Sequence, residues 1–248
     1  MGAAIIASRA CLRSGVGLLT VNVPKNERFI LQTSIPEAML SFREKFDFSI
    51  DHFSALCIGP GIGTDKTSAA FLSQIFKKLK KEPKPLILDA DALNIMAENR
   101  ELFNLIPKGA ILTPHPKEFD RLFGLHENTI ARIKTAAKKA KERQFLIVLK
   151  GHKTLISSLD GSFINSTGNA GLAKGGSGDA LTGIIAAFLA QGYSPLDAAQ
   201  LGVFIHGLAA DITLNQQSME SMLITDVIEN LGKAFIAISS QPTRKIES

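Results

Sequence analysis

Residues 165–179 read NSTGNAGLAKGGSGD and lead directly into the apolar segment 180–191, ALTGIIAAFLAQ. In the second segment the large apolar side chains recur at helical spacing, whereas the first segment is polar and rich in glycine. The stretch therefore predicts a glycine-rich loop that opens a buried helix beginning near Asp179.

The start of this helix has the features of an anion-binding site. The N–H groups in the first turn of a helix lack intrahelical acceptors, and together with the helix dipole they favour an anion such as a transferring phosphate. Glycines let the main chain approach that anion without obstruction by a Cβ atom. We predict an anion hole formed by Gly175, Gly176, Ser177 and Gly178. The simpler alternative is that Ser177 or Asp179 only caps the helix.

Asp179 is the predicted catalytic residue. A carboxylate beside a phosphate site repels the ligand, so its presence there calls for a chemical use. The use we predict is that of a general base, which accepts the proton of the hydroxyl that attacks the phosphoryl group. The segment is not a Walker loop, because no Gly-Lys-Ser/Thr ending is present.

Around this junction, short apolar runs alternate with longer amphipathic ones. The predicted strands are 18–23, 55–58, 85–88, 110–112, 145–149, 154–158 and 162–165. The predicted helices are 3–14, 67–81, 130–143, 179–191 and 195–213. This alternation predicts an α/β fold, with a mostly parallel sheet covered by helices on both faces and one domain over residues 1–248. The Asp160-Gly161 pair predicts a hairpin that gives the sheet an antiparallel edge.

The composition is that of a globular protein, with 45% hydrophobic and 21% charged residues in 248. The net charge of +5 raises the question of nucleic-acid binding. The basic runs at 77–81 and 138–141 have helical spacing and are better explained as solvated helix faces, so we predict no nucleic-acid partner.

The chain also lacks the signals of a membrane or secreted protein. No stretch approaches the roughly 18 consecutive apolar residues of a membrane span. Arg9 and Arg13 interrupt the apolar amino-terminal stretch, which argues against a signal peptide. We therefore expect a cytoplasmic protein with no membrane partner. Cys11 and Cys57 lie in apolar runs and are predicted to be small buried side chains in a reducing compartment.

Four predicted strands end in polar or glycine-rich residues. These are GPGIG at 59–63, DADALN at 89–94, TPHPKE at 113–118 and KGHKT at 150–154. In open α/β sheets, ligands bind at the carboxyl ends of the strands. The four segments therefore predict a common site at that edge, with the last segment suited to the phosphate or ribose of a nucleotide.

Individual side chains in these segments allow more than one role. His115, between two prolines, is predicted to hold a fixed imidazole that contacts substrate; the alternative is a structural role. Asp89 and Asp91 orient substrate or, with Glu118, help to place a magnesium ion; the alternative for Asp91 is a helix cap. His206, in an apolar helix, is predicted to be a satisfied core residue.

Together these motifs resemble the ADP/ATP-dependent (S)-NAD(P)H-hydrate dehydratase family, a branch of the ribokinase-like fold. The resemblance runs over nearly the whole chain, and the TPHP and KGGSGD elements are its most specific parts. The matching elements are GAA at 2–4, RSGVG at 13–17, GPG at 59–61, LDADAL at 88–93, TPHP at 113–116 with Glu118, LKG at 149–151 with Thr154, and TGN at 167–169 through Asp179.

The resemblance implies a three-layer sandwich and a repair reaction. In this family a nucleotide phosphorylates the hydroxyl of the S epimer of hydrated NADH or NADPH, and the phosphate then leaves to restore NADH or NADPH. ADP gives AMP in the bacterial type. The implied cofactors are Mg²⁺ and ADP (or ATP) as co-substrate, and the implied assembly is a homotetramer.

The matching motifs also carry residue roles. The hydrated dinucleotide is expected to contact Ala3, Gly61, His115 and Asp179. The adenine nucleotide is expected to contact Lys150, Gly151, His152, Lys153, Thr154 and Gly178. The resemblance assigns no residue as a resident metal ligand.

One difference from the family bears on the sheet. Family members have a further strand and a glycine-containing loop before the position of Gly2, so residues 1–248 are expected to form a sheet interrupted inside, with exposed apolar surface and unpaired main chain. The epimerase domain often fused upstream is not expected within 1–248. The alternatives are a ribokinase-like kinase for a hydroxymethylpyrimidine or thiazole alcohol, and a truncated protein that binds nucleotide without turnover.

Overall fold

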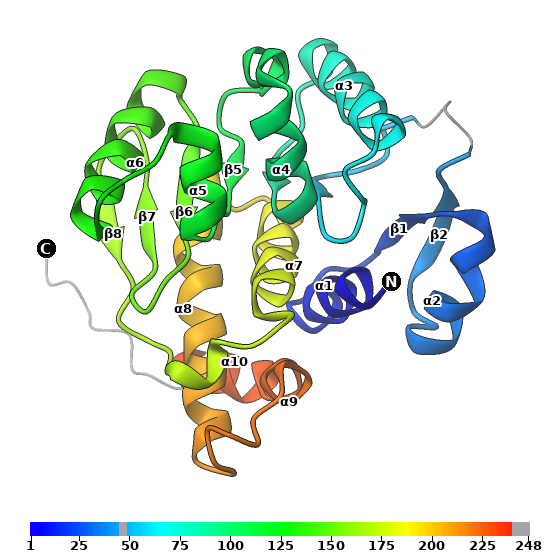
Figure 1. The fold of residues 1–248 in the computed structure, drawn as a ribbon. Helices are drawn as coiled ribbons and strands as arrows, with labels where there is room; N and C mark the ends of the chain where they lie inside the picture. Colours follow the sequence, from blue (N-terminus) through cyan, green and yellow to red (C-terminus); the bar gives the residue numbers. More distant parts are fainter. Residues whose placement is uncertain (45–48, 240–248) are drawn as a thin grey trace, which may run out of the picture.

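The computed structural model describes residues 1–44 and 49–239, and its centre is a six-stranded sheet (Figure 1). The strands lie in chain order across the sheet: β3 (Leu56–Ile58), β4 (Leu86–Leu88), β5 (Ile111–Leu112), β6 (Leu146–Leu149), β7 (Leu155–Ser157) and β8 (Ser162–Ile164). The first four are parallel, and β7 and β8 add an antiparallel edge. The predicted parallel sheet and the predicted hairpin are therefore confirmed.

Helices cover both faces of the sheet and make three layers (Figure 1). One layer contains α3 (Lys66–Lys81), α4 (Ala90–Glu98), α5 (Pro116–Phe123) and α6 (Thr129–Arg143). The other contains α1 (Gly2–Arg13), α7 (Ser177–Ala190), α8 (Pro195–Leu214), α9 (Ile224–Glu229) and α10 (Leu231–Ser239). Within the described ranges, no helix has the length and apolar character required to cross a bilayer.

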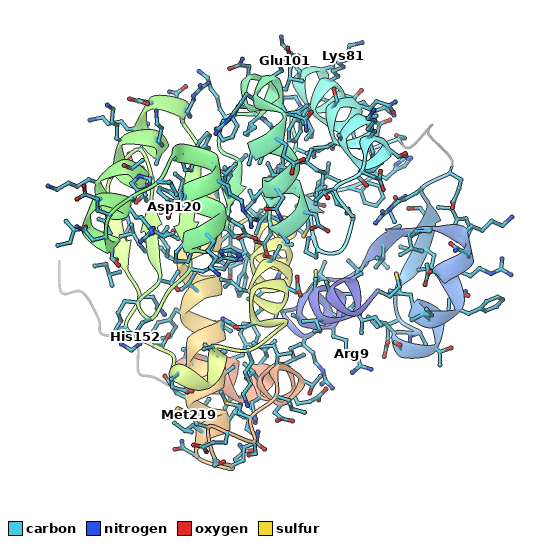
Figure 2. All side chains as sticks on the ribbon, viewed as in Figure 1. Arg9, Lys81, Glu101, Asp120, His152 and Met219 are labelled. Carbon is cyan, nitrogen blue, oxygen red and sulfur yellow. The ribbon has the colours of Figure 1, made fainter. Side chains whose placement is uncertain are left out.

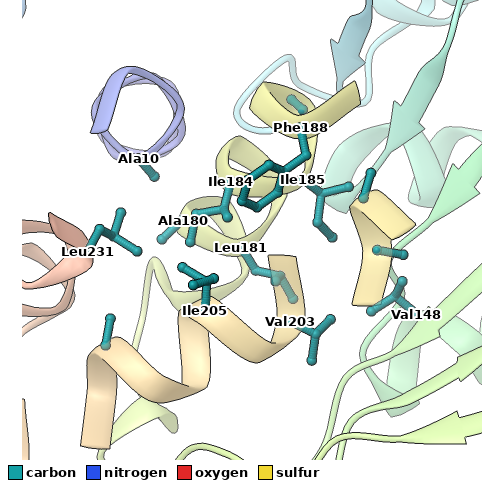
Figure 3. Packing of buried hydrophobic residues seen from close by; sticks show 14 of the residues in the cluster. Ala10, Val148, Ala180, Leu181, Ile184, Ile185, Phe188, Val203, Ile205 and Leu231 are labelled. Atoms are coloured by element: carbon teal, nitrogen blue, oxygen red, sulfur yellow. The ribbon is translucent and has the colours of Figure 1, made fainter. Parts of the chain in front are cut away.

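Strands β4 to β7 supply side chains to both layers, because successive side chains point to opposite faces of a sheet. Ile87 packs in the cluster that includes α7 and α8, whereas Leu88 packs in the cluster of α3 to α6. Figure 3 shows the first cluster gathered around α7, with Ala10 of α1 and Leu231 directed toward it. Burial on both faces explains why the strands read as short continuous apolar runs rather than as alternating ones.

The amino-terminal part forms a small sheet of its own. In it β1 (Thr20–Val23) pairs in parallel with β2 (Met39–Phe42), and the turn η1 (Lys25–Glu27) and helix α2 (Arg28–Ser34) connect them. Among the described strands, β1 pairs only with β2 and β3 pairs only with β4. The sheet is thus interrupted between β1 and β3, as the family resemblance implied, and Leu18 beside β1 is exposed.

A cavity of about 640 Å³ lies at this interruption. Its walls include residues of α1, β1, β3 and α7. Cys57 of β3 lines the cavity and is exposed, so the prediction of a buried side chain is wrong there, whereas Cys11 of α1 is buried as predicted. The strand pattern around Cys57 marked it as apolar, but only the interruption of the sheet left it uncovered.

The elements that periodicity did not predict are β2, α2, α4, α5, α9 and α10. Most are short, and α4 and α5 begin directly after strands, within the polar segments that the sequence marked as ligand loops. The remaining short turns are η2 (Arg100–Leu105) and η3 (Ala170–Leu172).

Candidate active site

A cavity of about 740 Å³ lies where the loops after β4, β5 and β6 meet the amino terminus of α7. Its lining includes Asp89, His115, Glu118, Lys150 and Asp179, and part of the glycine-rich loop. The prediction that the strand-end segments meet at one edge of the sheet is confirmed for three of the four. The fourth, 59–63, contacts this edge through its last residue, Gly63, whose N–H donates to Asp91 Oδ2 at 2.9 Å.

The first turn of α7 is open toward this cavity. Gly176 is the N-cap in a left-handed conformation, with φ of 87°, and no side chain caps the helix. The alternative that Ser177 or Asp179 merely caps α7 is therefore wrong. Ser177, Gly178 and Asp179 line the cavity, whereas Gly175 and Gly176 do not. A Cβ on Gly176 would also lie 2.5 Å from Ile6 Cδ1, so a larger residue there would require the Ile6 side chain to move.

Two contacts that the sequence did not indicate hold the glycine-rich loop. Asp211 in α8 accepts hydrogen bonds at 2.9 Å from Gly168 N and from Asn169 Nδ2. The ammonium of Lys174 donates to the carbonyls of Glu220 and Met222, at 2.6 and 2.7 Å. These contacts fix the course of the loop toward α7, and they hold the Lys174 ammonium on main-chain carbonyls.

Lys150 is placed by a buried carboxylate. Its Nζ lies 2.7 Å from Asp89 Oδ1 and 3.9 Å from Glu118 Oε2. Asp89 is only 1% exposed, and its other oxygen accepts a 2.8 Å hydrogen bond from Thr182 Oγ1 of α7. Sequence reasoning missed Thr182, because a threonine inside an apolar helix gives no signal of its own.

His115 caps the helix that follows it. Its Nδ1 accepts hydrogen bonds from the main-chain N–H groups of Lys117 and Glu118, and Glu118 Oε2 accepts one from His115 N at 2.8 Å. Because Nδ1 acts as an acceptor, the neutral ring carries its proton on Nε2. The side chain is 45% exposed and lines the cavity, so a fixed imidazole can donate from Nε2 to a bound ligand.

Asp179 has the electrostatics of a general base. Burial raises its pKa to about 6, repulsion from Asp89 adds to this, and the positive charge of Lys150 acts in the opposite direction. A carboxylate with a pKa near the working pH is mostly ionised at neutral pH yet basic enough to take a proton. The side chain lies in the first turn of α7, where no side chain caps the helix.

Comparison with known proteins places the chain in a family. The sequence model of the NAD(P)H-hydrate dehydratase family matches residues 1–233. The chain belongs to this family. It is 37% identical over 233 residues to an ADP-dependent (S)-NAD(P)H-hydrate dehydratase of Neisseria meningitidis, an alignment that covers 92% of this chain and 78% of that protein.

Other members of the NAD(P)H-hydrate dehydratase family are also similar to this chain. A crystal structure of the ADP/ATP-dependent NAD(P)H-hydrate dehydratase from Bacillus subtilis, co-crystallised with ATP/Mg²⁺, superposes with a TM-score of 0.83 at 31% identity and covers 95% of this chain and 84% of that one. A bifunctional NAD(P)H-hydrate repair enzyme of Moorella thermoacetica is 35% identical over 93% of this chain, which spans 46% of its length. The chain thus spans about half of such bifunctional relatives. The predicted ribokinase-like, three-layer α/β fold is confirmed.

The residues that the family resemblance assigned fall into two groups. Lys150, Gly151, His152, Thr154, Gly178, His115 and Asp179 all line the larger cavity. His152, labelled in Figure 2, is an exposed residue of the loop after β6, and the exposed Lys153 beside it does not line the cavity. Ala3 and Gly61 lie together, with 3.6 Å between the Ala3 Cβ and the place of a Gly61 Cβ, but neither lines that cavity.

The carboxylates of this family member do not assemble a metal centre. The described residues contain no group of three or more histidine, cysteine, aspartate or glutamate side chains suited to holding an ion. Asp89 is engaged by Lys150 and Thr182, and Asp91 by Gly63. The described residues therefore offer no cluster of three such ligands from Asp89, Asp91 and Glu118, and within them Asp89 rather than Asp91 is the N-cap of α4.

His206 is buried, as predicted, but it is not satisfied. Its Nε2 has no hydrogen-bond partner among the described residues, and burial lowers the pKa of the ring to about 4, so the imidazole is neutral. The residue also contributes to the wall of the larger cavity. An apolar helical pattern does not reveal that one of its positions borders a cavity.

Proposed function

We propose that this protein catalyses the ADP-dependent dehydration of the S epimer of hydrated NADH or NADPH to NADH or NADPH, with release of AMP and phosphate. The observation that carries the proposal is Asp179, with its raised pKa, in the uncapped first turn of α7 beside Lys150. This pairs a base with an anion-binding helix terminus, as phosphoryl transfer to a hydroxyl requires. The names of the Neisseria and Bacillus relatives support the same reaction.

The proposed reaction has two stages. Asp179 accepts the proton of the substrate hydroxyl as that oxygen attacks the β-phosphoryl group of ADP, and AMP departs. The new phosphate ester then loses phosphate as the ring nitrogen donates its lone pair, and loss of a ring proton restores the double bond. The N–H groups of the first turn of α7 stabilise the charge on the transferring phosphoryl group.

The proposed ligand contacts form two groups, one for each ligand. The nucleotide contacts Lys150, Gly151, His152, Lys153, Thr154 and Gly178. The hydrated dinucleotide contacts Ala3, Gly61, His115 and Asp179. Mg²⁺ enters with the nucleotide, because magnesium commonly binds through substrate phosphates and few protein ligands. Bound there, it would neutralise phosphate charge.

The direct test is recovery of reduced-nicotinamide absorbance from hydrated NADH mixed with ADP, Mg²⁺ and the protein. We expect recovery with the wild type, and a loss of about 10²–10⁴-fold in kcat for Asp179→Ala, because a positioned base contributes a factor of that order. Retained circular dichroism shows that the variant is folded. Full activity of Asp179→Ala would remove it as the base.

Product analysis separates the remaining alternatives. A vitamin-precursor kinase would convert a hydroxymethylpyrimidine or thiazole alcohol into a stable phosphate ester. Thermal stabilisation by ADP without any product would favour nucleotide binding without turnover. We also propose that residues 1–248 act as one domain within a homotetramer, which light scattering tests directly.

A further inference from the structure

Lys150 occupies an unusually restricted position beside the first turn of α7. A Cβ atom on Gly178 would lie 2.9 Å from Lys150 Nζ, so the ammonium lies directly against the helix backbone at a residue that has no side chain. An ammonium has three donors, and Asp89 Oδ1 at 2.7 Å accepts from one of them. Glu118 Oε2 at 3.9 Å lies beyond hydrogen-bonding distance. Lys150 therefore keeps donors for an oxygen in the cavity that it lines.

The position of Asp89, whose carboxylate holds Lys150, is set by its main chain, by Thr182, and indirectly by Thr113. Asp89 N donates to the Ile58 carbonyl of β3 at 3.1 Å, which sets the main chain at the end of β4. Thr182 Oγ1 donates to Asp89 Oδ2 at 2.8 Å from the second turn of α7. Thr113 Oγ1, after β5, lies 3.5 Å from the same hydroxyl. Thr113 and Thr182 are both fully buried.

These contacts link helix α7, which carries Asp179, to the Lys150 side chain through the buried carboxylate of Asp89. Thr182 lies on the same helix as Asp179, one turn further along, so the distance from Asp179 to the Lys150 ammonium depends on how Thr182 holds Asp89. A buried charge that loses its partner is strongly unfavourable, which keeps Asp89 and Lys150 together.

We propose that Thr182 and Asp89 are positioning residues that hold the Lys150 ammonium at the first turn of α7, where it contacts the transferring phosphoryl group. This inference rests on the proposed function, and in it Thr182 and Asp89 affect the reaction through their effect on the position of Lys150. Removing the Thr182 hydroxyl leaves Asp89 Oδ2 without that donor, so the carboxylate and Lys150 lose their fixed geometry. Misplacement of about 1 Å in a catalytic constellation costs up to ~10²-fold in rate.

The test compares Thr182→Val with Thr182→Ser and with the control Thr213→Val. Thr213 is also a buried helical threonine, with Oγ1 donating to the Ala209 carbonyl at 2.7 Å, but it does not line the cavity. We expect Thr182→Val to lower kcat by about 10–100-fold with a smaller change in KM for the hydrated dinucleotide. Thr182→Ser restores most of the rate, and Thr213→Val keeps it.

The pH–rate profile gives a readout that a merely structural role would not move. Burial and the carboxylates Asp89, Asp91 and Glu118 raise the pKa of Asp179, and the positive charge of Lys150 lowers it. When Lys150 is less well placed, the acidic limb of the kcat profile should move to higher pH in Thr182→Val but not in Thr213→Val. A wild-type kcat and an unshifted limb in folded Thr182→Val would overturn the proposal.

Two further measurements distinguish a failure of the positioning proposal from a folding defect and from a failure of the proposed function. Asp89→Asn preserves shape and removes the charge that holds Lys150, so wild-type kcat in this variant would also overturn the proposal, even if Thr182→Val did not fold. The ADP-induced rise in Tm should be smaller in both site variants than in Thr213→Val, whether or not turnover occurs; equal rises would contradict the placement of Lys150. An inactive wild type in the same assay would instead contradict the proposed function.

Discussion

At the scale of single residues, the negative charge of Asp179 serves the proposed catalysis but lowers the stability of the folded protein. Burial and the negative charge of Asp89 raise its pKa to about 6, well above the ordinary aspartate value of 3.8. Between these two pH values the native state binds more protons than the unfolded chain, so this group lowers the free energy of unfolding as pH rises through the window. Above pH 6 the ionised side chain is a destabilising charge that catalysis requires.

Asp179→Asn should therefore stabilise the protein at pH 8 and have little effect on stability at pH 4. Partial exposure and solvent screening limit the gain to about 1 kcal/mol, or roughly 2–4 °C in Tm. Calorimetry at the two pH values measures it. The control is Asp160→Asn in the β7–β8 turn, where asparagine before glycine suits the turn equally well. An equal gain at both pH values would show that charge is not the cause.

The same pKa predicts the pH dependence of the rate. Since the base must be ionised, kcat/KM should fall about tenfold per pH unit below pH 6 and level off above it. Initial rates of NADH recovery between pH 5 and pH 8 test this. A rate that stays constant down to pH 5 would mean that a different group takes the proton.

At the scale of elements, the orientation of α7 depends on its close approach to α1. A Cβ atom on Gly183 would lie 2.1 Å from the Ala7 carbonyl oxygen, so α1 packs against a helix surface that has no side chain at that position. Helix propensity alone favours alanine over glycine by about 1 kcal/mol. The packing contact reverses that preference, because the two helices would have to separate.

Gly183→Ala should accordingly destabilise the protein by about 1–3 kcal/mol, the usual cost of overpacking a core. Gly232→Ala in α10 is the matched control: no atom lies within 4 Å of its added Cβ, so it should be neutral or stabilising by up to about 1 kcal/mol. Urea unfolding of the two variants gives both values. A stable Gly183→Ala protein would mean that α1 and α7 can shift apart without cost.

At the scale of the whole molecule, the sheet is built in two unequal parts. Strands β4 to β7 are buried between two large apolar clusters, whereas the small cluster shared by β1, β2 and α2 has four buried members among the described residues, Val23, Leu31, Ile35 and Ala38. Because β1 and β3 do not pair, main-chain hydrogen bonds do not join these parts into one sheet. The free energy of opening should differ between them.

Native-state hydrogen exchange should detect this difference. Amides of β1 are expected to exchange through local opening at a lower free energy than amides of β5 and β6, which should approach the global value. Mass spectrometry at increasing sub-denaturing urea separates the two regimes. Identical opening free energies for β1 and β6 would show that the molecule opens as one unit despite the interrupted sheet.

The sequence by itself determined the features that depend on residues close to one another in the chain. Apolar runs predicted the described strands other than β2, helical spacing predicted α3, α6, α7 and α8, and the Asp160-Gly161 pair predicted the hairpin. The glycine-rich junction before Asp179 predicted an open helix terminus, because glycines followed by an apolar helix are adjacent in the chain. These predictions held because each depends on residues within one or two turns of one another.

Only the tertiary structure decided which side chains meet. Asp89 pairs with Lys150 across 61 positions and with Thr182 across 93, and neither spacing leaves a pattern in the sequence. These contacts occupy the Asp89 carboxylate, which the local sequence had suggested as a group that helps to place a magnesium ion. The interrupted sheet likewise leaves Cys57 exposed, although its apolar neighbours predicted burial. The physical reason is that such contacts depend on how strands order in the sheet and how helices approach it, and a buried charge pairs with whatever partner that arrangement brings near.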